Sequence, residues 1–247
     1  MLVPIGSWCR TAYQVNEFLK TNGIQSVTYP FDWTVTPFTA LKLTLDKHFK
    51  PSDVLQNDNL RLSLFGSLLD VKTQLIHHHD LPPTIVKRFE YVDGKQSINK
   101  HRVPFELFKS TEIGKAKGRF EYGFSNFKLL KSHNKKIGFV RWIRSGHPDA
   151  GLPDAFEGES ISSLATIINC FLGHDNFSIL QVKSHLAQKE NNCNNIISSY
   201  EIQKYGVAAT ILERKGFNGD GTENFRGDTP SWHKLLSKYV DDQEIDL

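Results

Sequence analysis

The chain has few cysteines, and their spacing provides no disulfide framework. Its 247 residues include only Cys9, Cys170 and Cys193, without a Cys-x-x-Cys metal site. A run of about 18 apolar residues, which a membrane-spanning helix requires, does not occur. The first residues lack the basic and apolar regions of a signal peptide. We therefore expect a soluble, cytoplasmic protein without a membrane span.

An excess of charge of one sign is also lacking. The 30 basic and 27 acidic residues leave a formal charge of +3, and lysine and arginine are dispersed along the chain. Such a distribution gives little support to nucleic-acid binding. Hydrophobic residues make up 39% and charged residues 23% of the chain, as in ordinary folded domains. We expect a small-molecule or glycan substrate and no nucleic-acid partner.

Strand-like and helix-like segments alternate along the chain, which is typical of parallel βαβ units. We predict an α/β fold, one domain over 1–247 in three layers, with a mostly parallel central sheet and helices on both faces. The polar stretch 90–116 is predicted to be a loop or lid. Strands are predicted over 2–6, 25–29, 73–77, 135–143, 177–182 and 205–213. Helices are predicted over 11–21, from Pro37 to 49, over 120–130, from Ser160 to Gly173, and from Thr229 onward.

Cys9 lies where the first predicted strand turns into the first predicted helix. Ligands of parallel sheets bind beyond the carboxyl ends of the strands. The free N–H groups of a helix start stabilise a thiolate, lower its pKa and bind an oxyanion. Cys9 is therefore a candidate nucleophile, although a free cysteine is commonly a small buried hydrophobic residue. Cys170, on an apolar helix face, is predicted to be in the core, and Cys193 in a polar loop.

The segment from His77 to Asp80 offers a base for such a thiol, because it follows another predicted strand. His79, nearest the loop, is the preferred base, and His78 is the second choice. Asp80 or Asp32 would orient the imidazole. A solvated strand end is an equally simple interpretation of these histidines.

Two alternatives to this base remain open. A metal ion bound by His77 and His79 would need a third ligand that the sequence does not indicate, so no metal is predicted. His233, which follows Asp228 near the end of the chain, is a further candidate base.

Four residues are predicted to contact substrate: Ser7, Arg10, Trp33 and Arg141. Asp32 lies between aromatic residues, and a buried carboxylate needs a partner, for which we consider Arg10, Arg141 and a histidine. Arg141 interrupts an apolar strand, which indicates either an anion contact or a buried pair with Asp32.

The segments PIGSWCRTAYQV at 4–15 and SVTYPFDWTVTP at 26–37 resemble motifs of a bacterial family of papain-like cysteine peptidases. The resemblance continues through 77–80, KGRFEYGF at 117–124 and KKIGFVRW at 135–142. Looser similarity extends to GSCFA-type relatives of GDSL esterases and to capsule-biosynthesis acetyltransferases. The family resemblance implies a Cys–His hydrolase or acyltransferase associated with polysaccharide or secondary-metabolite biosynthesis. Papain-type folds begin with a helix and continue into an antiparallel barrel, whereas strands and helices alternate in this sequence.

The leading hypothesis is a cysteine-dependent acyl-transfer enzyme in which Cys9 attacks a thioester, ester or amide and His79 relays the proton. Water or a sugar hydroxyl is the acceptor, so hydrolase and acyltransferase both stay open. No cofactor is required, although Arg10, Arg141 and Arg144 would suit a phosphate-bearing donor such as an acyl-coenzyme A.

Two other functions remain in view. One is a non-catalytic glycan- or nucleotide-binding domain, in which Trp8, Trp33 and Trp142 form a stacking surface. The other is a metal-dependent hydrolase built on the histidine segment.

Overall fold

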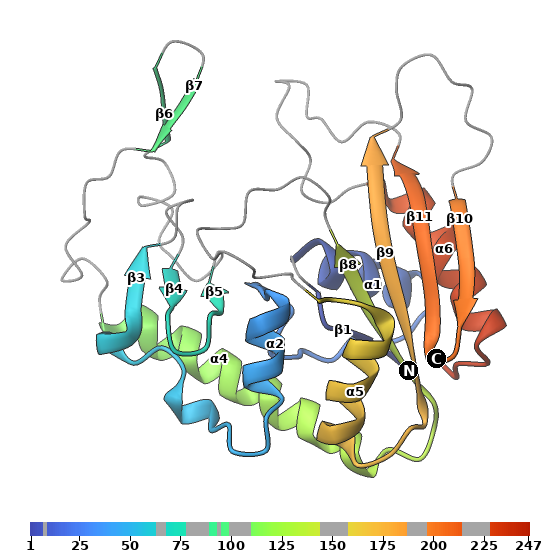
Figure 1. Ribbon diagram of the computed structural model, residues 1–247, viewed down its shortest axis with the longest axis horizontal. Helices are drawn as coiled ribbons and strands as arrows, with labels where there is room; N and C mark the ends of the chain where they lie inside the picture. The colour runs from blue at the N-terminus through green and yellow to red at the C-terminus, as the bar shows by residue number, and fades with distance from the viewer. Residues whose placement is uncertain are drawn as a thin grey trace.

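The main sheet has five strands and is mostly parallel. The computed structural model describes residues 1–6, 9–62, 68–77, 89–92, 95–98, 110–143, 158–186, 197–213 and 228–247. The strand order is β1-β8-β9-β11-β10 (Figure 1). All its pairs are parallel except that of β10 with β11. The predicted α/β class is therefore confirmed. The bounds are β1 (Leu2–Pro4), β8 (Ile137–Ile143), β9 (Phe177–Leu186), β11 (Gly206–Glu213) and β10 (Ile197–Gln203).

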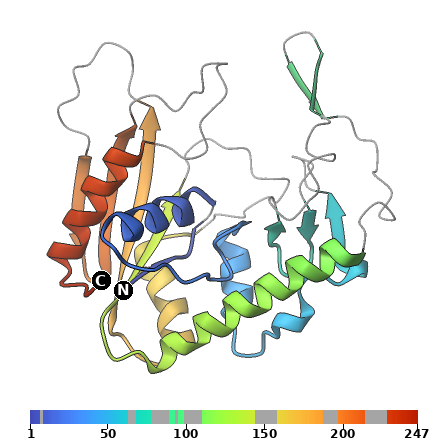
Figure 2. The same ribbon diagram turned by 180° about the vertical axis from the view of Figure 1, so that it is seen from behind.

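Alternate residues of the strands pack into two different hydrophobic clusters, because successive side chains of a strand point to opposite faces. Leu2 and Val140 pack with helices α1 (Cys9–Thr21) and α6 (Thr229–Asp242). Val3 and Phe139 pack with residues of helix α5 (Ile161–Leu172). Helices α1 and α6 lie side by side, with the rings of Phe18 and His233 5.6 Å apart (Figure 2).

A second sheet, of four short antiparallel strands, was not predicted. Its order is β2-β5-β4-β3, and its pairs are all antiparallel. Helix α2 (Phe38–Thr44) follows its first strand and begins after Pro37, as predicted. The described residues also form 3₁₀ turns at Pro51–Asp53, Asn57–Asn59 and Leu130–Ser132. The strands are β2 (Thr34–Val35), β5 (Ile76–His77), β4 (Leu68–Asp70) and β3 (Leu60–Leu62).

Two predicted strands are corrected by this second sheet. Residues 25–29 are described and form no strand, and the segment ends in a turn in which the Asp32 N–H donates to the Tyr29 carbonyl. Of 73–77, only Ile76 and His77 form a strand. The Asp70 carboxylate accepts N–H bonds from Lys72 and Thr73 and holds the preceding residues in a turn. Both segments therefore lie outside the parallel sheet.

Helix α4 (Ser110–Leu129) is longer than predicted and takes in the end of the 90–116 excursion. Of the remaining excursion, the structure describes the hairpin of β6 (Phe89–Val92) and β7 (Lys95–Ile98). Phe120, Phe124 and Phe127 of α4 enter a hydrophobic cluster with residues of both sheets. Gly123 lets α4 lie directly on the Tyr29–Pro30 peptide, since a Cβ there would be 2.7 Å from the Tyr29 carbonyl carbon.

Helix α5 begins and ends where the sequence predicts. Ser160 caps its first turn in a reciprocal pair with Ser163, and Gly173 closes it in the left-handed conformation, with φ +79°. Cys170 is exposed, so its predicted place in the core is wrong. The buried positions of α5 follow a helical stripe that passes on either side of Cys170.

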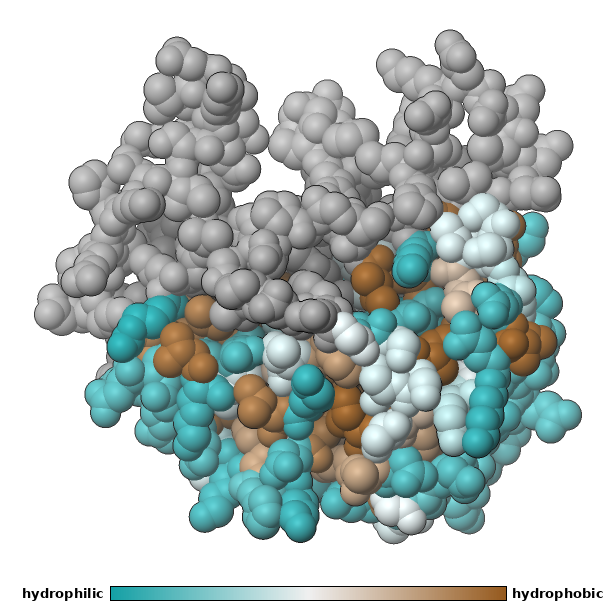
Figure 3. Space-filling model, viewed as in Figure 1, coloured by the Kyte–Doolittle hydropathy of each residue, from teal (hydrophilic) through white to brown (hydrophobic). Residues whose placement is uncertain are grey.

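The described surface is mainly hydrophilic in the view of Figure 3, with apolar side chains in small groups between the hydrophilic ones. Among the described residues, no helix is both long and apolar enough to cross a membrane.

Candidate active site around Cys9

Cys9 is the first residue of α1 and lies at the carboxyl edge of the main sheet, as predicted. Strand β1 pairs in parallel with β8, with Pro4 opposite Val140. The Ile5 N–H extends this pairing by donating to the Val140 carbonyl at 2.9 Å. Cys9 follows four residues later and is 7% exposed. Ser7 and Trp8, between them in the sequence, lie outside the described residues.

The thiol of Cys9 is more weakly acidic than the sequence predicts. Burial raises the pKa of Cys9 above its ordinary value. The backbone N–H groups of Cys9 and Arg10 and the charge of Arg10 act in the opposite direction. The predicted helix-start effect is therefore present but is outweighed by burial. In this state the sulfur is a thiol at neutral pH, and nucleophilic attack requires a base to remove its proton.

Arg10 and Trp142 hold the first turn of α1 against β8. The guanidinium carbon of Arg10 lies 4.3 Å from the Trp142 ring centroid, and both side chains are buried. This is the geometry of a cation–π contact. Trp142 therefore does not belong to an exposed stacking surface, contrary to our alternative hypothesis, and Arg10 is not an exposed cation.

Arg141 forms a buried ion pair with Glu159, and not with Asp32 as we considered. Arg141 Nε and Nη2 donate to the two carboxylate oxygens of Glu159 at 2.7 and 2.8 Å. The Nη1 atom donates to the Ile5 carbonyl at 2.7 Å. The side chains of Arg141 and Glu159 are 0% and 2% exposed. Glu159 was missed by the sequence analysis. The sequence feature that could have indicated Glu159 is its position, as an acidic residue directly before the helix cap Ser160.

Asp32 is buried in the turn that precedes β2. Its Oδ2 atom accepts the Tyr29 backbone N–H at 2.9 Å. Its Oδ1 atom is buried and has no hydrogen-bond partner in the described part of the chain. Burial raises the pKa of Asp32 to about 8, although the bond from Tyr29 acts to lower it. At neutral pH Asp32 is therefore mainly a neutral acid, which does not suit its predicted role as an orienting carboxylate.

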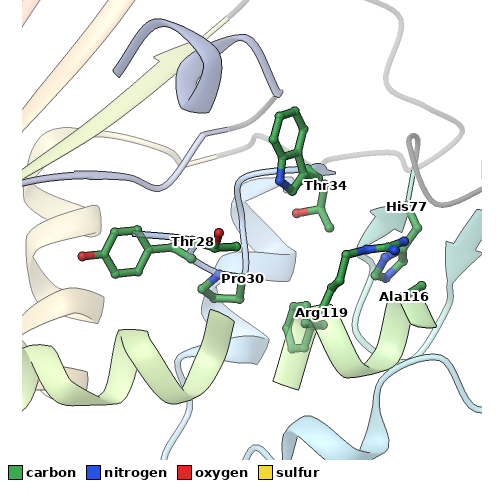
Figure 4. A pocket seen from close by; sticks show the side chains of 9 residues that line it. Thr28, Pro30, Thr34, His77, Ala116 and Arg119 are labelled. Carbon is green, nitrogen blue, oxygen red and sulfur yellow. The ribbon is translucent and has the colours of Figure 1, made fainter. Parts of the chain in front are cut away.

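The histidine segment begins beside a small pocket. His77 ends β5, is 1% exposed and lies opposite Thr34 of β2. His77 and Arg119 line a cavity of about 20 Å³ together with Trp33 and Phe120, which is room for one water molecule. Figure 4 shows His77 and Arg119 at one end of this pocket. Arg119 was not singled out from the sequence, where it is one of many dispersed cations.

The predicted bases, His78 and His79, follow His77 directly in the sequence. Both lie outside the described residues, as does Asp80. Within the described residues, no hydrogen bond joins Cys9 to an imidazole, and no group of three or more His, Cys, Asp or Glu could hold a metal ion. His233 packs edge-on against Phe18 between α1 and α6. The start of α1 and the end of β5 face the same side of the molecule in both views (Figures 1 and 2).

Comparisons of the chain with protein-family models, curated proteins and solved structures found no match. The site of this chain consists of a buried thiol at a helix start, two arginines engaged with protein partners, and a pocket at the start of the histidine segment.

Proposed function

We propose that the chain is a cysteine-dependent acyl-transfer enzyme with Cys9 as its nucleophile. The observation that carries this proposal is the position of Cys9 at the first turn of α1, at the carboxyl edge of the parallel sheet. There the N–H groups of Cys9 and Arg10 favour negative charge on the sulfur. The same N–H groups would favour the oxyanion of a tetrahedral intermediate. We also propose the cytoplasm as its compartment.

The proposed reaction has two acyl transfers through Cys9. A histidine, His79 or His78, takes the thiol proton as the sulfur bonds to the acyl carbon. That proton passes to the leaving group, which departs and leaves a thioester on Cys9. The acceptor, water or a sugar hydroxyl, then gives its proton to the histidine and bonds to the acyl carbon. The carbon–sulfur bond breaks, and Cys9 regains a proton.

The acid–base roles follow from the burial of Cys9 and Asp32. Because burial raises the pKa of Cys9, a histidine acting as general base is required and not merely helpful. Asp80 is the better candidate to orient that histidine. Asp32, with a pKa of about 8, would keep its proton at neutral pH and could act only as a hydrogen-bond donor.

The donor is proposed to be a thioester or activated ester, and the chain itself needs no cofactor. An acyl-coenzyme A is one such donor. Its phosphates gain no support from Arg10 or Arg141, because both guanidinium groups are buried against protein partners. Arg119, exposed at the pocket, is the better placed cation.

Trapping the thioester tests the proposal. The protein would be incubated with p-nitrophenyl acetate or acetyl-coenzyme A, quenched in acid, and mapped by peptide mass spectrometry. We expect an acetyl group on Cys9 that is lost in Cys9→Ala and retained in Cys170→Ala, the matched control at an exposed cysteine. Acetylation of Cys170 alone, or of neither cysteine at any substrate concentration, overturns the proposal.

A second function, non-catalytic binding of a glycan or nucleotide, is favoured by one observation. Trp33 lines the pocket and is 41% exposed, and an exposed aromatic face stacks on sugars and bases. This function predicts saturable binding in calorimetry that Trp33→Ala abolishes and Cys9→Ala leaves intact. If both variants still bound the ligand, the pocket would be excluded as the binding site.

A further inference from the structure

Arg141 joins three segments that are distant in the sequence. It lies within β8 and is completely buried. Its guanidinium group binds Glu159 through two nitrogens and the Ile5 carbonyl through the third. Ile5 directly follows β1 and lies four residues before Cys9. Arg141 therefore contacts the backbone between β1 and the proposed nucleophile.

Glu159 is itself held firmly by the cap of α5. Ser163 Oγ donates to the Gly158 carbonyl at 2.9 Å, and the Ser160 N–H donates to Ser163 Oγ at 2.8 Å. The residues on both sides of Glu159 are thus fixed by the first turn of the helix. The carboxylate is therefore a fixed point to which the guanidinium group is bound.

Stability does not explain why an ion pair occupies this place. Burying two charges is costly, and well-packed hydrophobic residues of similar volume are often equally stable or more so. Hydrophobic residues cannot, however, donate to the Ile5 carbonyl. The next residue of β8, Trp142, faces the opposite side of the sheet and contacts Arg10. Adjacent residues of β8 thus contact the chain on both sides of Cys9, at Ile5 and at Arg10.

We propose that Arg141 is a positioning residue, which fixes the thiol of Cys9 through the Ile5 carbonyl and is itself oriented by Glu159. This inference rests on the proposed function, since it concerns the same thiol. It assigns no contact with substrate to Arg141, which is enclosed by its own partners. It replaces the substrate-binding role that the sequence indicated for this residue.

The test compares alkylation of Cys9 by iodoacetamide, as a function of pH, in the wild type and in an Arg141→Met/Glu159→Leu double variant. We expect the double variant to keep its melting temperature, because the buried pair is replaced by apolar volume. Its Cys9 should become less buried, so the alkylation midpoint falls toward the ordinary thiol value. A fall of about one pKa unit would make labelling about tenfold faster at neutral pH. Arg10, the charged side chain that acts on the thiol, is unchanged in this comparison.

Two further measurements separate positioning from a general loosening of the fold. Labelling of Cys170 in the same sample should stay constant, whereas acetylation of Cys9 should fall even as its alkylation rises. Arg141→Lys keeps the charge but cannot bind both Glu159 and the Ile5 carbonyl with a planar fork, so it should shift the Cys9 profile in the same direction. This variant keeps the proposal testable if the double variant does not fold.

An unchanged Cys9 profile in either folded variant overturns the positioning role. That result is distinct from failure of the proposed function. If the wild type forms no acetyl adduct, the acyl-transfer proposal fails, while the alkylation profiles still report whether Arg141 places the thiol.

Discussion

Asp32 closes a turn on Tyr29, whose backbone N–H donates to the Asp32 carboxyl at 2.9 Å. The carboxyl group is 1% exposed. Its pKa is raised to about 8 by burial, compared with about 3.9 in an unfolded chain. Between these two values the folded protein holds a proton that the unfolded chain releases. The turn beside the pocket therefore couples folding to pH.

Asp32→Asn should remove a pH dependence from the stability of the protein. With a raised folded pKa, the contribution of Asp32 is fully present below about pH 4 and is lost as the pH rises through about 8. The free energy of unfolding should fall across this window by up to about 1.4 kcal/mol per pH unit. Urea unfolding at several pH values would measure it. Parallel curves for wild type and Asp32→Asn would contradict the raised pKa.

Cys9 should be alkylated more slowly than Cys170 in the folded protein near neutral pH. Cys9 is buried with a raised pKa, and Cys170 is exposed. In urea the two rates should converge, because the difference arises from the fold. Peptide mass spectrometry of iodoacetamide-treated samples gives both rates from one experiment. Faster labelling of Cys9 near pH 6 would show that the helix start, and not burial, governs this thiol.

Gly123→Ala should destabilise the protein. A Cβ at this position would lie 2.7 Å from the Tyr29 carbonyl carbon and 2.8 Å from the Pro30 nitrogen, so α4 would have to move away from the loop. Overpacking of this kind costs about 1–3 kcal/mol. Gly118→Ala on the same helix is the control. Its Cβ would meet nothing within 4 Å, and alanine favours the helix by about 0.5–1 kcal/mol. Equal effects of the two substitutions would contradict the close approach.

Ser160→Ala should weaken the start of α5. The Ser160 hydroxyl accepts the Ser163 N–H at 3.1 Å, and loss of such a cap costs about 0.5–2 kcal/mol. Ser162 lies two residues further along the chain and is exposed. Ser162→Ala removes no cap and should leave stability nearly unchanged. Chemical denaturation of the three proteins measures both effects. A Ser160→Ala variant as stable as Ser162→Ala would show that the cap does not stabilise the helix.

Local signals in the sequence predicted four of the five strands of the main sheet and several helix ends correctly. Ser160 and Gly173 specify α5 because caps act within one turn. The buried strand β8 is evident from its own apolar residues. Strand β10 was missed because its side chains are mostly exposed and leave no apolar alternation. The strand predicted at 25–29 was wrong: its residues form no strand, and its last residue, Tyr29, begins a turn closed by Asp32.

The site was predictable in its position but not in its electrostatics. Cys9 was placed correctly at a helix start because the strand-to-helix transition is local. The direction of its pKa shift was wrong, because burial depends on elements that pack around it from distant parts of the chain. The partner of Arg141 could not be chosen from the sequence either. Glu159 and Asp32 are both acidic and both buried, and only the folded chain distinguishes them.

The division of the molecule into two sheets bears directly on any chemistry that joins Cys9 to the segment following His77. Cys9 begins the helix that follows β1 of the parallel sheet, and His77 belongs to the antiparallel sheet. Residues of the two sheets share one hydrophobic cluster. A nucleophile and a base that are positioned by different sheets depend for their alignment on how the two sheets pack against each other. Side chains such as Phe31, Phe38 and Leu41, which belong to that cluster, would then influence the catalytic geometry without touching a substrate.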